Sequence, residues 1–350
     1  MSTSEIPTQF TGYGAKSEAE GKQLDLSLIS YTPKTWTEND VDIKISHCGI
    51  CGSDLHVLTN GWPRPTSYSA IVGHERSKSG HVIGQRVGVG AQGGSCLDCE
   101  YCDKKKEQFC NNGMIGTYQG KWEDGSIAQG GYADYTRCHG RFAIPIPDEI
   151  SSAEAAPLLC AGVTTFAPLK RFGCGPGKKV GVVGIGGLGH LALQWAAAMG
   201  AETFALSHSD SKHKDAERLG VKPENFIITK DDAATAKKYA RSLDIIICTS
   251  SHLLAIETLY FQLLRPEGTI VLLGLPEEKL PSFYGQALVG KNLSLAGSLI
   301  GSTEEIKEML ALAAAKNVRP WVTVRPLSEA SQAVKDTENG LPRYRYVLEI

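Results

Sequence analysis

The chain has 350 residues, of which 42% are hydrophobic and 21% are charged. It is long enough for two domains, because a single hydrophobic core stops growing at about 250–300 residues, and its composition is that of an ordinary globular protein. The formal net charge is −2. A chain whose main partner is nucleic acid usually carries a basic excess, so we do not expect nucleic acid as the main partner.

The N-terminal segment and the cysteine content indicate the cellular compartment. The N-terminus, Met1–Pro7, has neither the basic nor the apolar region of a secretory signal peptide. The ten cysteines are therefore expected to be metal ligands or buried thiols in a cytoplasmic protein. Residues 180–206 are conspicuously apolar, but glycines interrupt them, and His190, Gln194 and Glu202 would sit badly in lipid. We expect no membrane span there.

The first 150 residues contain short β-type runs separated by glycine and proline. Examples are Val41–Ser46, His81–Val89 and Phe142–Pro147. Many short strands with this punctuation predict a β-barrel or sandwich. Around residues 154–162 the pattern becomes helical.

From Lys179 onward, apolar strands alternate with helices. This alternation predicts a parallel sheet covered by helices on both faces. Two further elements, a helix over Thr303–Ala315 and a strand over Arg343–Ile350, are expected near the C-terminus. The strands and helices expected between residues 180 and 297 are strand Val180–Gly184, helix Leu188–Met199, strand Thr203–Ser207, helix Ser211–Leu219, strand Asn225–Thr229, strand Asp244–Cys248, helix Leu253–Leu264, strand Gly268–Leu273 and strand Leu293–Gly297.

Four cysteines, Cys96, Cys99, Cys102 and Cys110, lie within one short segment. Zinc takes four soft ligands in a tetrahedron, and short loops let a single segment supply all of them. Such a closed site is structural, because no position is left for a substrate. A zinc-ribbon nucleic-acid module is disfavoured, since ribbons separate their two Cys-x-x-Cys pairs by a longer span.

A second, open metal site requires ligands from elsewhere in the chain. The candidates are the segment Cys48-Gly-Ile-Cys51, the pair His74-Glu75 and the isolated Cys160. Two cysteines and one histidine would bind zinc and leave a fourth position open for a substrate. Taken singly, each cysteine is more often a buried thiol and the histidine a structural loop residue. The four-cysteine segment raises the odds that they act together.

A glycine-rich segment indicates a dinucleotide site. Gly184, Gly186 and Gly189, with Gly187 and Leu188 between them, form Gly-x-Gly-x-x-Gly after a predicted strand and before a predicted helix. In that context the motif is a strong Rossmann fingerprint, because the glycines let a pyrophosphate approach the helix N-terminus.

The end of the second predicted strand bears on the choice of cofactor. An NAD site places Asp or Glu there to hold the ribose 2′-hydroxyl, whereas this chain has Ser207, followed by Ser209 and Lys212. A hydroxyl accepts a 2′-phosphate and lysines neutralise it, so we predict NADP rather than NAD. Lys212 would otherwise be part of a solvated helix face, and Asp210 would offset the positive charge.

The ordered set of motifs resembles the zinc-dependent medium-chain alcohol dehydrogenases. It comprises Cys-Gly-Ser-Asp-x-His from Cys51, Gly-His-Glu from Gly73, the four-cysteine lobe, Leu-Cys-Ala-Gly around Cys160 and the glycine fingerprint. The chain is most similar to the NADP-dependent cinnamyl alcohol dehydrogenase branch. The resemblance implies an α/β architecture: a GroES-like β-barrel catalytic domain over residues 1–156 and 299–350, with a structural zinc lobe at 93–112, and a Rossmann domain with a doubly wound parallel sheet at 157–298.

The resemblance also implies roles for single residues. The catalytic zinc ligands would be Cys51, His74 and Cys160, with Glu75 behind or intermittently on the zinc and Asp54 orienting His74. The other roles it implies are a proton relay through Ser53, the cofactor ribose and His56, and a contact with the nicotinamide for Thr164.

The implied activity is reversible hydride transfer between NADP(H) and a primary alcohol or aldehyde. The aromatic, cinnamyl-type or medium-chain aliphatic substrate would react mainly as the aldehyde, in a homodimer with two zinc ions per chain. The dimer would use the Rossmann sheet edge near residues 290–300. Alternatives are a polyol, sugar or ketone-reducing dehydrogenase of the same superfamily and, more remotely, a non-catalytic cofactor-binding protein.

The chain departs from plant cinnamyl enzymes after Cys110. Those enzymes carry a tryptophan against the substrate ring, whereas the segment Asn111–Tyr118 here has none. A roomier pocket is therefore expected. Its candidate lining residues are Trp62, Ile115, Leu299 and Ile300.

Overall fold

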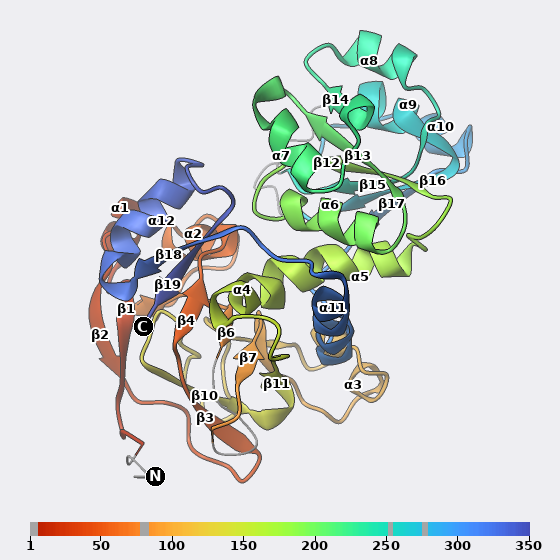
Figure 1. The fold of residues 1–350 in the computed structure, drawn as a ribbon. Helices are drawn as coiled ribbons and strands as arrows, with labels where there is room; N and C mark the ends of the chain where they lie inside the picture. Colours follow the sequence, from red (N-terminus) through yellow and green to blue (C-terminus); the bar gives the residue numbers. More distant parts are fainter. Residues whose placement is uncertain (1–5, 78–83, 251–254, 275–278) are drawn as a thin grey trace. The chain divides into compact units, whose positions relative to one another are not determined.

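The computed structural model describes residues 6–77, 84–250, 255–274 and 279–350. The chain forms two compact units (Figure 1). The first unit comprises residues 1–160, 301–315 and 319–350, and the second comprises residues 161–300 and 316–318. The first unit thus takes both ends of the chain, and the second is inserted between them.

The first unit is built from short strands, most of them paired antiparallel. A three-stranded sheet has the order β2-β1-β5, a six-stranded sheet has the order β11-β7-β6-β4-β19-β18, and β10-β3 and β8-β9 form pairs. Only the pairing of β18 with β19 is parallel among these described strands. The strands are β1 (Phe10–Ala15), β2 (Ser27–Tyr31), β3 (Asp40–Lys44), β4 (His47–Gly49), β5 (Ala70–Ile71), β6 (Arg76–Ser77), β7 (Val87–Val89), β8 (Gln92–Gly94), β9 (Ile115–Gly116), β10 (Tyr135–His139), β11 (Ile144–Pro145), β18 (Val322–Pro326) and β19 (Arg345–Glu349).

The helices of the first unit are short apart from α11. Cys51 in extended backbone precedes α2, and the Asp54 carboxylate accepts a hydrogen bond from the Cys51 N–H at 3.0 Å, which closes the first turn. Ser151 and Glu154 cap α4 reciprocally: the Ser151 side chain accepts from the Glu154 N–H, and the Glu154 carboxylate accepts from the Ser151 N–H. The helices are α1 (Glu18–Gln23), α2 (Gly52–Leu58), α3 (Glu100–Asp103), η1 (Glu107–Phe109), η2 (Gly140–Phe142), α4 (Ser152–Pro157), α11 (Thr303–Lys316), η7 (Leu327–Glu329) and α12 (Ala330–Glu338).

The second unit contains a six-stranded parallel sheet in the order β14-β13-β12-β15-β16-β17. Numbered along the unit, this order is 3-2-1-4-5-6, that of the Rossmann fold. The predicted combination of a barrel-type unit and a doubly wound parallel sheet is therefore confirmed. The elements are α5 (Val163–Arg171), β12 (Lys179–Val183), α6 (Gly189–Ala198), β13 (Glu202–Ser207), η4 (Asp210–Lys212), α7 (His213–Arg218), η5 (Pro223–Asn225), β14 (Phe226–Ile228), α8 (Asp232–Lys238), β15 (Leu243–Cys248), η6 (Ile256–Tyr260), α9 (Phe261–Leu263), β16 (Leu264–Leu272), α10 (Gln286–Val289) and β17 (Ser294–Gly297).

Two of the predicted helices differ from the structure. The one expected over Ser211–Leu219 is a 3₁₀ turn followed by the short helix α7. The one expected over Leu253–Leu264 begins partly outside the described residues; its described part is a π-turn, η6, and one turn, α9, and Leu264 already opens β16. In the described part of this run Ile256, Leu259 and Phe261 are buried, whereas Thr258 and Gln262 are exposed. The periodicity of a short apolar run does not by itself separate a helix from a strand or set where one ends and the other begins.

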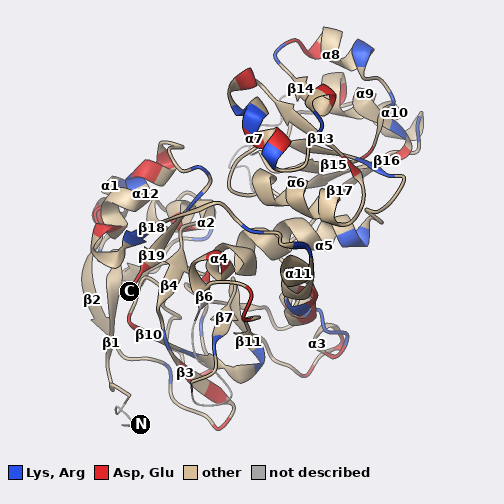
Figure 2. Ribbon diagram, viewed as in Figure 1, with Lys and Arg blue, Asp and Glu red and all other residues tan. Residues whose placement is uncertain are grey.

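Charged side chains of both signs share the same helices, as α7 and α8 illustrate in Figure 2. Within the residues that the structure describes, no helix is both long and apolar enough to cross a membrane.

Candidate active site and cofactor site

Cys51, His74, Glu75 and Cys160 lie together inside the first unit. One potential ligand atom from each residue lies within 4.8 Å of the others, and all four residues are buried. Cys51 precedes α2, His74 and Glu75 follow β5, and Cys160 lies in the π-turn η3 (Leu158–Gly162). The topology thus brings three distant segments to one point, and it brings Cys51 rather than Cys48 into the group.

The geometry of the two sulfur atoms fits a tetrahedral zinc. The Sγ atoms of Cys51 and Cys160 are 4.0 Å apart. Two Zn–S bonds of about 2.3 Å at a tetrahedral angle would place the sulfurs about 3.8 Å apart. The His74 Nε2 and one oxygen of Glu75, Oε2, are buried and have no hydrogen-bond partner among the described residues. A buried cation would satisfy both atoms.

The electrostatics of the group also favour a dication. A hydrogen bond from the Cys160 thiol holds the pKa of Cys51 well below its usual range. The same hydrogen bond, with burial, raises the pKa of Cys160 well above its usual range. Burial opposes protonation of His74, but the Cys51 thiolate beside it raises the pKa of the imidazole to about 9. Two adjacent buried thiols do not both ionise readily unless a cation lies between them.

Asp54 has a different set of partners from the one we expected. Its carboxylate accepts hydrogen bonds from the backbone N–H groups of Cys51 and Gly73 at 3.0 and 3.1 Å, and from the Tyr132 hydroxyl at 2.9 Å. Among the described hydrogen bonds, none joins Asp54 to the His74 ring. That ring instead stacks on Tyr118, with centroids 5.2 Å apart and planes inclined by 15°. Asp54 therefore holds the backbone before His74 rather than its imidazole.

Glu75 pairs with Arg345 of β19, and both side chains are buried. Burial raises the pKa of Glu75 to about 7, although Arg345 opposes the shift. Gly49 makes room for the carboxylate, because a Cβ at residue 49 would lie 1.8 Å from Oε2. Sequence reasoning missed Arg345. The available signal was its position two residues before the buried Val347 on a strand, which places a charge on the core-facing side.

Ser53 and His56 lie on α2, beside Cys51. The Ser53 Oγ is 3.8 Å from the Cys51 Sγ, and the His56 ring stacks on Trp62 with centroids 5.2 Å apart. Of the four candidate lining residues, Trp62 thus packs on the proposed relay. Ile115 is half-buried in β9, and Leu299 and Ile300 belong to the second unit.

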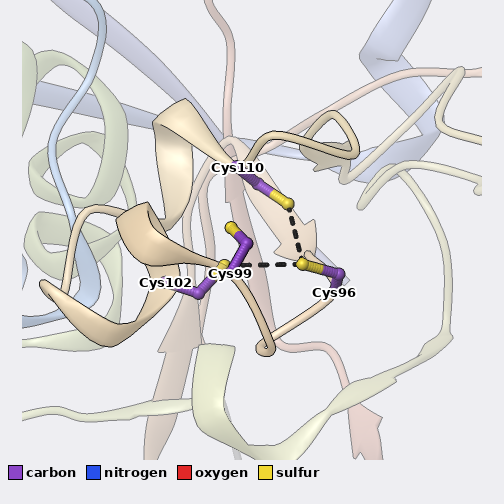
Figure 3. Close-up of side chains that lie close together, drawn as sticks. All are labelled: Cys96, Cys99, Cys102 and Cys110. Carbon is purple, nitrogen blue, oxygen red and sulfur yellow. Dashed lines mark hydrogen bonds between the residues drawn. The ribbon is translucent and has the colours of Figure 1, made fainter.

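The four lobe cysteines also meet. Their Sγ atoms lie within 4.8 Å of one another, with 3.3 Å between Cys96 and Cys110 and 4.0 Å between Cys96 and Cys102, and Figure 3 shows the sulfurs of these two pairs facing each other. The Asn111 N–H bonds to the Cys99 sulfur at 3.5 Å, and such backbone bonds lower the pKa of Cys99 to about 6. A set of four thiols, one already favouring the thiolate, fits a closed zinc site.

The fingerprint loop has the geometry that a dinucleotide requires. Gly184 has φ +84°, and a Cβ at Gly189 would lie 1.9 Å from the carbonyl oxygen of Gly184, so both positions need glycine. A Cβ at Gly186 would meet no atom within 4 Å, which leaves its surroundings open to a ligand. Gly187 and Leu188 complete the loop, and Leu188 immediately precedes α6.

The segment after β13 is tied to this loop. Lys212 donates a hydrogen bond to the Ile185 carbonyl at 2.6 Å. Ser207 is the last residue of β13, and its hydroxyl accepts from the Ser209 N–H at 3.5 Å. Asp210, which we expected to offset the lysine charge, pairs with His213 at 3.1 Å. The remaining predicted residue, Thr164, is buried in α5 of this unit.

Comparison with known proteins gives the same family for both units. Residues 37–148 match the alcohol dehydrogenase GroES-like domain and residues 187–315 match the zinc-binding dehydrogenase family. NADP-dependent alcohol dehydrogenase 6 of Saccharomyces cerevisiae is 38% identical over 98% of this chain and 97% of its own length.

Solved structures agree with this match. A cinnamyl alcohol dehydrogenase from Sorghum bicolor has a TM-score of 0.90 and 32% identity, and covers 97% of both chains. The CAD of Helicobacter pylori, solved with NADP(H), has a TM-score of 0.88 and 30% identity over 98% of this chain and 99% of its own. The chain therefore belongs to the zinc-dependent medium-chain alcohol dehydrogenases, in their cinnamyl alcohol dehydrogenase-like branch, and is an oxidoreductase.

Proposed function

We propose that this protein transfers a hydride between NADP(H) and a primary alcohol or aldehyde, mainly as an aldehyde reductase. The observation that carries the proposal is the buried group of Cys51, His74, Glu75 and Cys160, whose ligand atoms lie within 4.8 Å of one another. Two thiolates and one imidazole are a ligand set that leaves zinc an open position. The NADP dependence named for the yeast relative and the NADP(H) complex of the bacterial one support the choice of cofactor.

The roles of the residues follow from this arrangement. Zinc held by Cys51, His74 and Cys160 would supply a Lewis acid that polarises the carbonyl group. NADPH would supply the hydride. The Ser53 hydroxyl, close to the Cys51 sulfur, would give its proton to the product oxygen, and His56 would return a proton to it from solvent. An imidazole suits this duty because one ring nitrogen can accept a proton while the other donates one.

The proposal also includes a structural zinc, the division into two domains, the cellular location and a homodimer. Cys96, Cys99, Cys102 and Cys110 would bind a second, structural zinc, and the catalytic and Rossmann domains would divide near residues 156 and 299. The location would be cytoplasmic. The homodimer would form along β17, which lies at an edge of the parallel sheet, and sedimentation of the purified protein measures its mass directly.

A mutation of one ligand tests the activity. His74→Ala is expected to remove one zinc per chain and to lower turnover by about a thousandfold, because a Lewis acid contributes several kcal/mol to the barrier. Zinc is measured on the same sample as the rate of aldehyde reduction. Full zinc content with normal turnover would rule out this site.

A panel of substrates tests the proposed class. Aromatic, aliphatic and branched aldehydes, ketones and polyols are assayed with NADPH and NADH, and we expect aldehydes with NADPH to give the highest kcat/KM. A clear preference for ketones or polyols would favour the alternative dehydrogenase classes. Absence of turnover in a zinc-loaded, cofactor-binding sample would favour a non-catalytic protein.

Ser207, Ser209 and Lys212 carry the proposed preference for NADP. Ser207→Asp places a carboxylate where the 2′-phosphate would bind, at the end of β13. We expect the ratio of kcat/KM for NADPH to that for NADH to fall by at least about tenfold. A repulsion of about 1.4 kcal/mol between the new carboxylate and the 2′-phosphate would weaken binding by that factor. Ser328→Asp, at an exposed position of the first unit, is the control. An unchanged ratio in Ser207→Asp would contradict the assignment.

A further inference from the structure

We propose that Tyr132 is a positioning residue whose hydroxyl, acting through Asp54, holds the Cys51 and His74 segments in register for the metal. The inference rests on the proposed zinc site and adds a residue whose hydroxyl, among the described hydrogen bonds, bonds to Asp54 and to no ligand side chain. Its basis is a buried hydrogen-bond junction in the first unit.

The junction centres on the Asp54 carboxylate. Its Oδ2 accepts from the Tyr132 hydroxyl at 2.9 Å and from the Cys51 N–H at 3.0 Å, while Oδ1 accepts from the Gly73 N–H at 3.1 Å. Asp54 and Tyr132 are each 0% exposed. One carboxylate thus joins the residue that carries the first thiol to the residue before the imidazole, and the phenol fixes its orientation.

The backbone of the Tyr132 segment follows the loop that leads to His74. Gly130 donates to the Ile71 carbonyl at 2.7 Å, and Tyr132 donates to the Val72 carbonyl at 3.0 Å. Gly131 donates to the Gly73 carbonyl at 2.7 Å. These backbone bonds fix the position of Tyr132 relative to the loop, so that its hydroxyl is held against the Asp54 carboxylate.

Gly73 shows how closely the two segments pack. Its φ is +101°, and a Cβ there would lie 2.6 Å from the Tyr132 ring. The ring therefore fills the space beside the residue before His74, and ring packing and hydroxyl bonding act on the same short loop. Removing the hydroxyl alone separates these two contributions.

Loss of the hydroxyl leaves a buried carboxylate with one donor fewer. Buried carboxylates need their hydrogen bonds, so we expect Asp54 to turn and to loosen its hold on the N–H groups of Cys51 and Gly73. Partners that orient metal ligands from behind typically change metal affinity by about 10–100-fold. Tyr132→Phe should therefore weaken metal binding at the buried site while keeping the ring in place.

The experiment compares Tyr132→Phe with Tyr68→Phe in the full, zinc-loaded chain. Tyr68 also lies in the first unit and donates one hydrogen bond, to the Leu58 carbonyl at 2.8 Å, away from the metal group. Zinc is titrated against a chromogenic chelator. We expect Tyr132→Phe to lose one zinc at about 10–100-fold lower chelator concentration, while the second zinc and both zincs of Tyr68→Phe behave as in the wild type.

Cobalt substitution gives a readout that depends on ligand geometry. The visible bands of cobalt at the buried site should shift in Tyr132→Phe and not in Tyr68→Phe. Wild-type chelator titration and wild-type cobalt bands in Tyr132→Phe would overturn the inference. So would equal weakening of both zincs, because that would indicate general destabilisation.

Cys51→Ser separates this inference from the proposed function. If Cys51→Ser keeps two zincs with wild-type affinity, the proposed zinc site is wrong. If Cys51→Ser loses a zinc that Tyr132→Phe binds as the wild type does, only the role of Tyr132 is wrong. Should Tyr132→Phe fail to fold, Asp54→Asn tests the same junction, since an amide has one acceptor oxygen for three donors; unchanged zinc affinity in that variant would overturn the inference.

Discussion

The two groups of potential metal ligands in the first unit are assembled from the chain in opposite ways. The lobe takes Cys96, Cys99, Cys102 and Cys110 from one segment, and Cys96 and Cys99 remain partly exposed. The buried group takes its members from residues that are up to 109 positions apart, and all four are buried. A local group can form as soon as its own segment folds, whereas the distributed group exists only after the whole unit has folded.

The surroundings of the two groups differ as much as their sequences. The buried group includes the charged Glu75, which pairs with Arg345, and Asp54 lies beside it, bonded to the Cys51 N–H. Around the lobe sulfurs the described partners are mostly thiols and backbone N–H groups. Charge placed close to a metal tunes its chemistry, so this difference supports the proposal that the buried group is catalytic and the lobe structural.

The largest expected effect comes from Cys51→Ser in the buried group. Turnover should fall by about a thousandfold, for the reason given for His74, while the thermal midpoint should change less than in a lobe variant. The measurements are kcat with a preferred aldehyde and Tm by calorimetry. Retention of wild-type turnover would contradict a catalytic role for the buried group.

The same substitution in the lobe, Cys99→Ser, should act on stability. Loss of a structural zinc removes binding free energy that belongs to the folded state, so Tm should fall by several degrees or more. Activity per folded, cofactor-binding molecule should stay within about threefold of the wild type at low temperature. A loss of activity as large as that of Cys51→Ser, in a protein that is still folded, would mean that the lobe takes part in the chemistry.

The next largest effect concerns the anchor of the lobe. Glu107 of η1 is buried, and its carboxylate accepts from Arg141 at 2.9 Å through Nε and at 2.5 Å through Nη2, as well as from Thr303 at the start of α11 at 3.3 Å. Glu107→Gln removes the charge from a partly buried pair, which should cost on the order of 2 kcal/mol. We expect a fall in Tm of roughly 4–8 °C.

Zinc titration distinguishes this anchor from a general loss of stability. In Glu107→Gln the lobe zinc should be released at lower chelator concentration, and the buried zinc should not. The exposed Glu100, which pairs with Lys104 on the same lobe, provides the control variant Glu100→Gln. Equal release of both zincs would show that the two groups are not independent.

Local sequence patterns were enough to predict much of the molecule. The strand and helix alternation after Lys179 predicts the parallel sheet, because strands buried on both faces must be apolar and are separated by helices. The lobe follows from cysteine spacing alone. The residue types of the buried group made them candidates for one metal site, but only the resemblance to a family selected Cys51 over Cys48, since no local rule links either cysteine to Cys160.

The supporting residues were missed because their partners are distant and chemically ordinary. Arg345 pairs with Glu75 across 270 residues, and Thr303 meets Glu107 across 196. Tyr132 lies in a Gly-Gly-Tyr-Ala stretch, and nothing in that stretch indicates that its hydroxyl reaches Asp54. Such contacts are set by the folded topology, which strand periodicity does not encode.

The smallest expected effect lies at the surface beside the lobe. Glu304 of α11 is partly exposed and accepts from Lys307 at 2.8 Å. That hydrogen bond, with the charges of Lys307, Lys105 of the lobe and Arg141, lowers the pKa of Glu304. A carboxyl whose pKa is lower in the folded state stabilises the fold above its unfolded pKa of about 4.3, and that stabilisation is lost as the pH falls.

Glu304→Gln should therefore lower the free energy of unfolding at pH 7 by less than about 1 kcal/mol, as is typical for exposed pairs. The difference from the wild type should shrink as the pH falls below the unfolded pKa of about 4.3 toward the lower folded pKa. It should also shrink in high salt, because exposed charges are screened. Urea unfolding over this pH range, with zinc in excess, measures it. A difference that did not vary with pH would mean that Glu304 stabilises α11 by packing, and the lobe would then owe nothing to this surface charge. The expected result would assign a small, salt-sensitive contribution to Glu304 and leave the larger electrostatic contribution to Glu107 and Arg141, whose pair is partly buried.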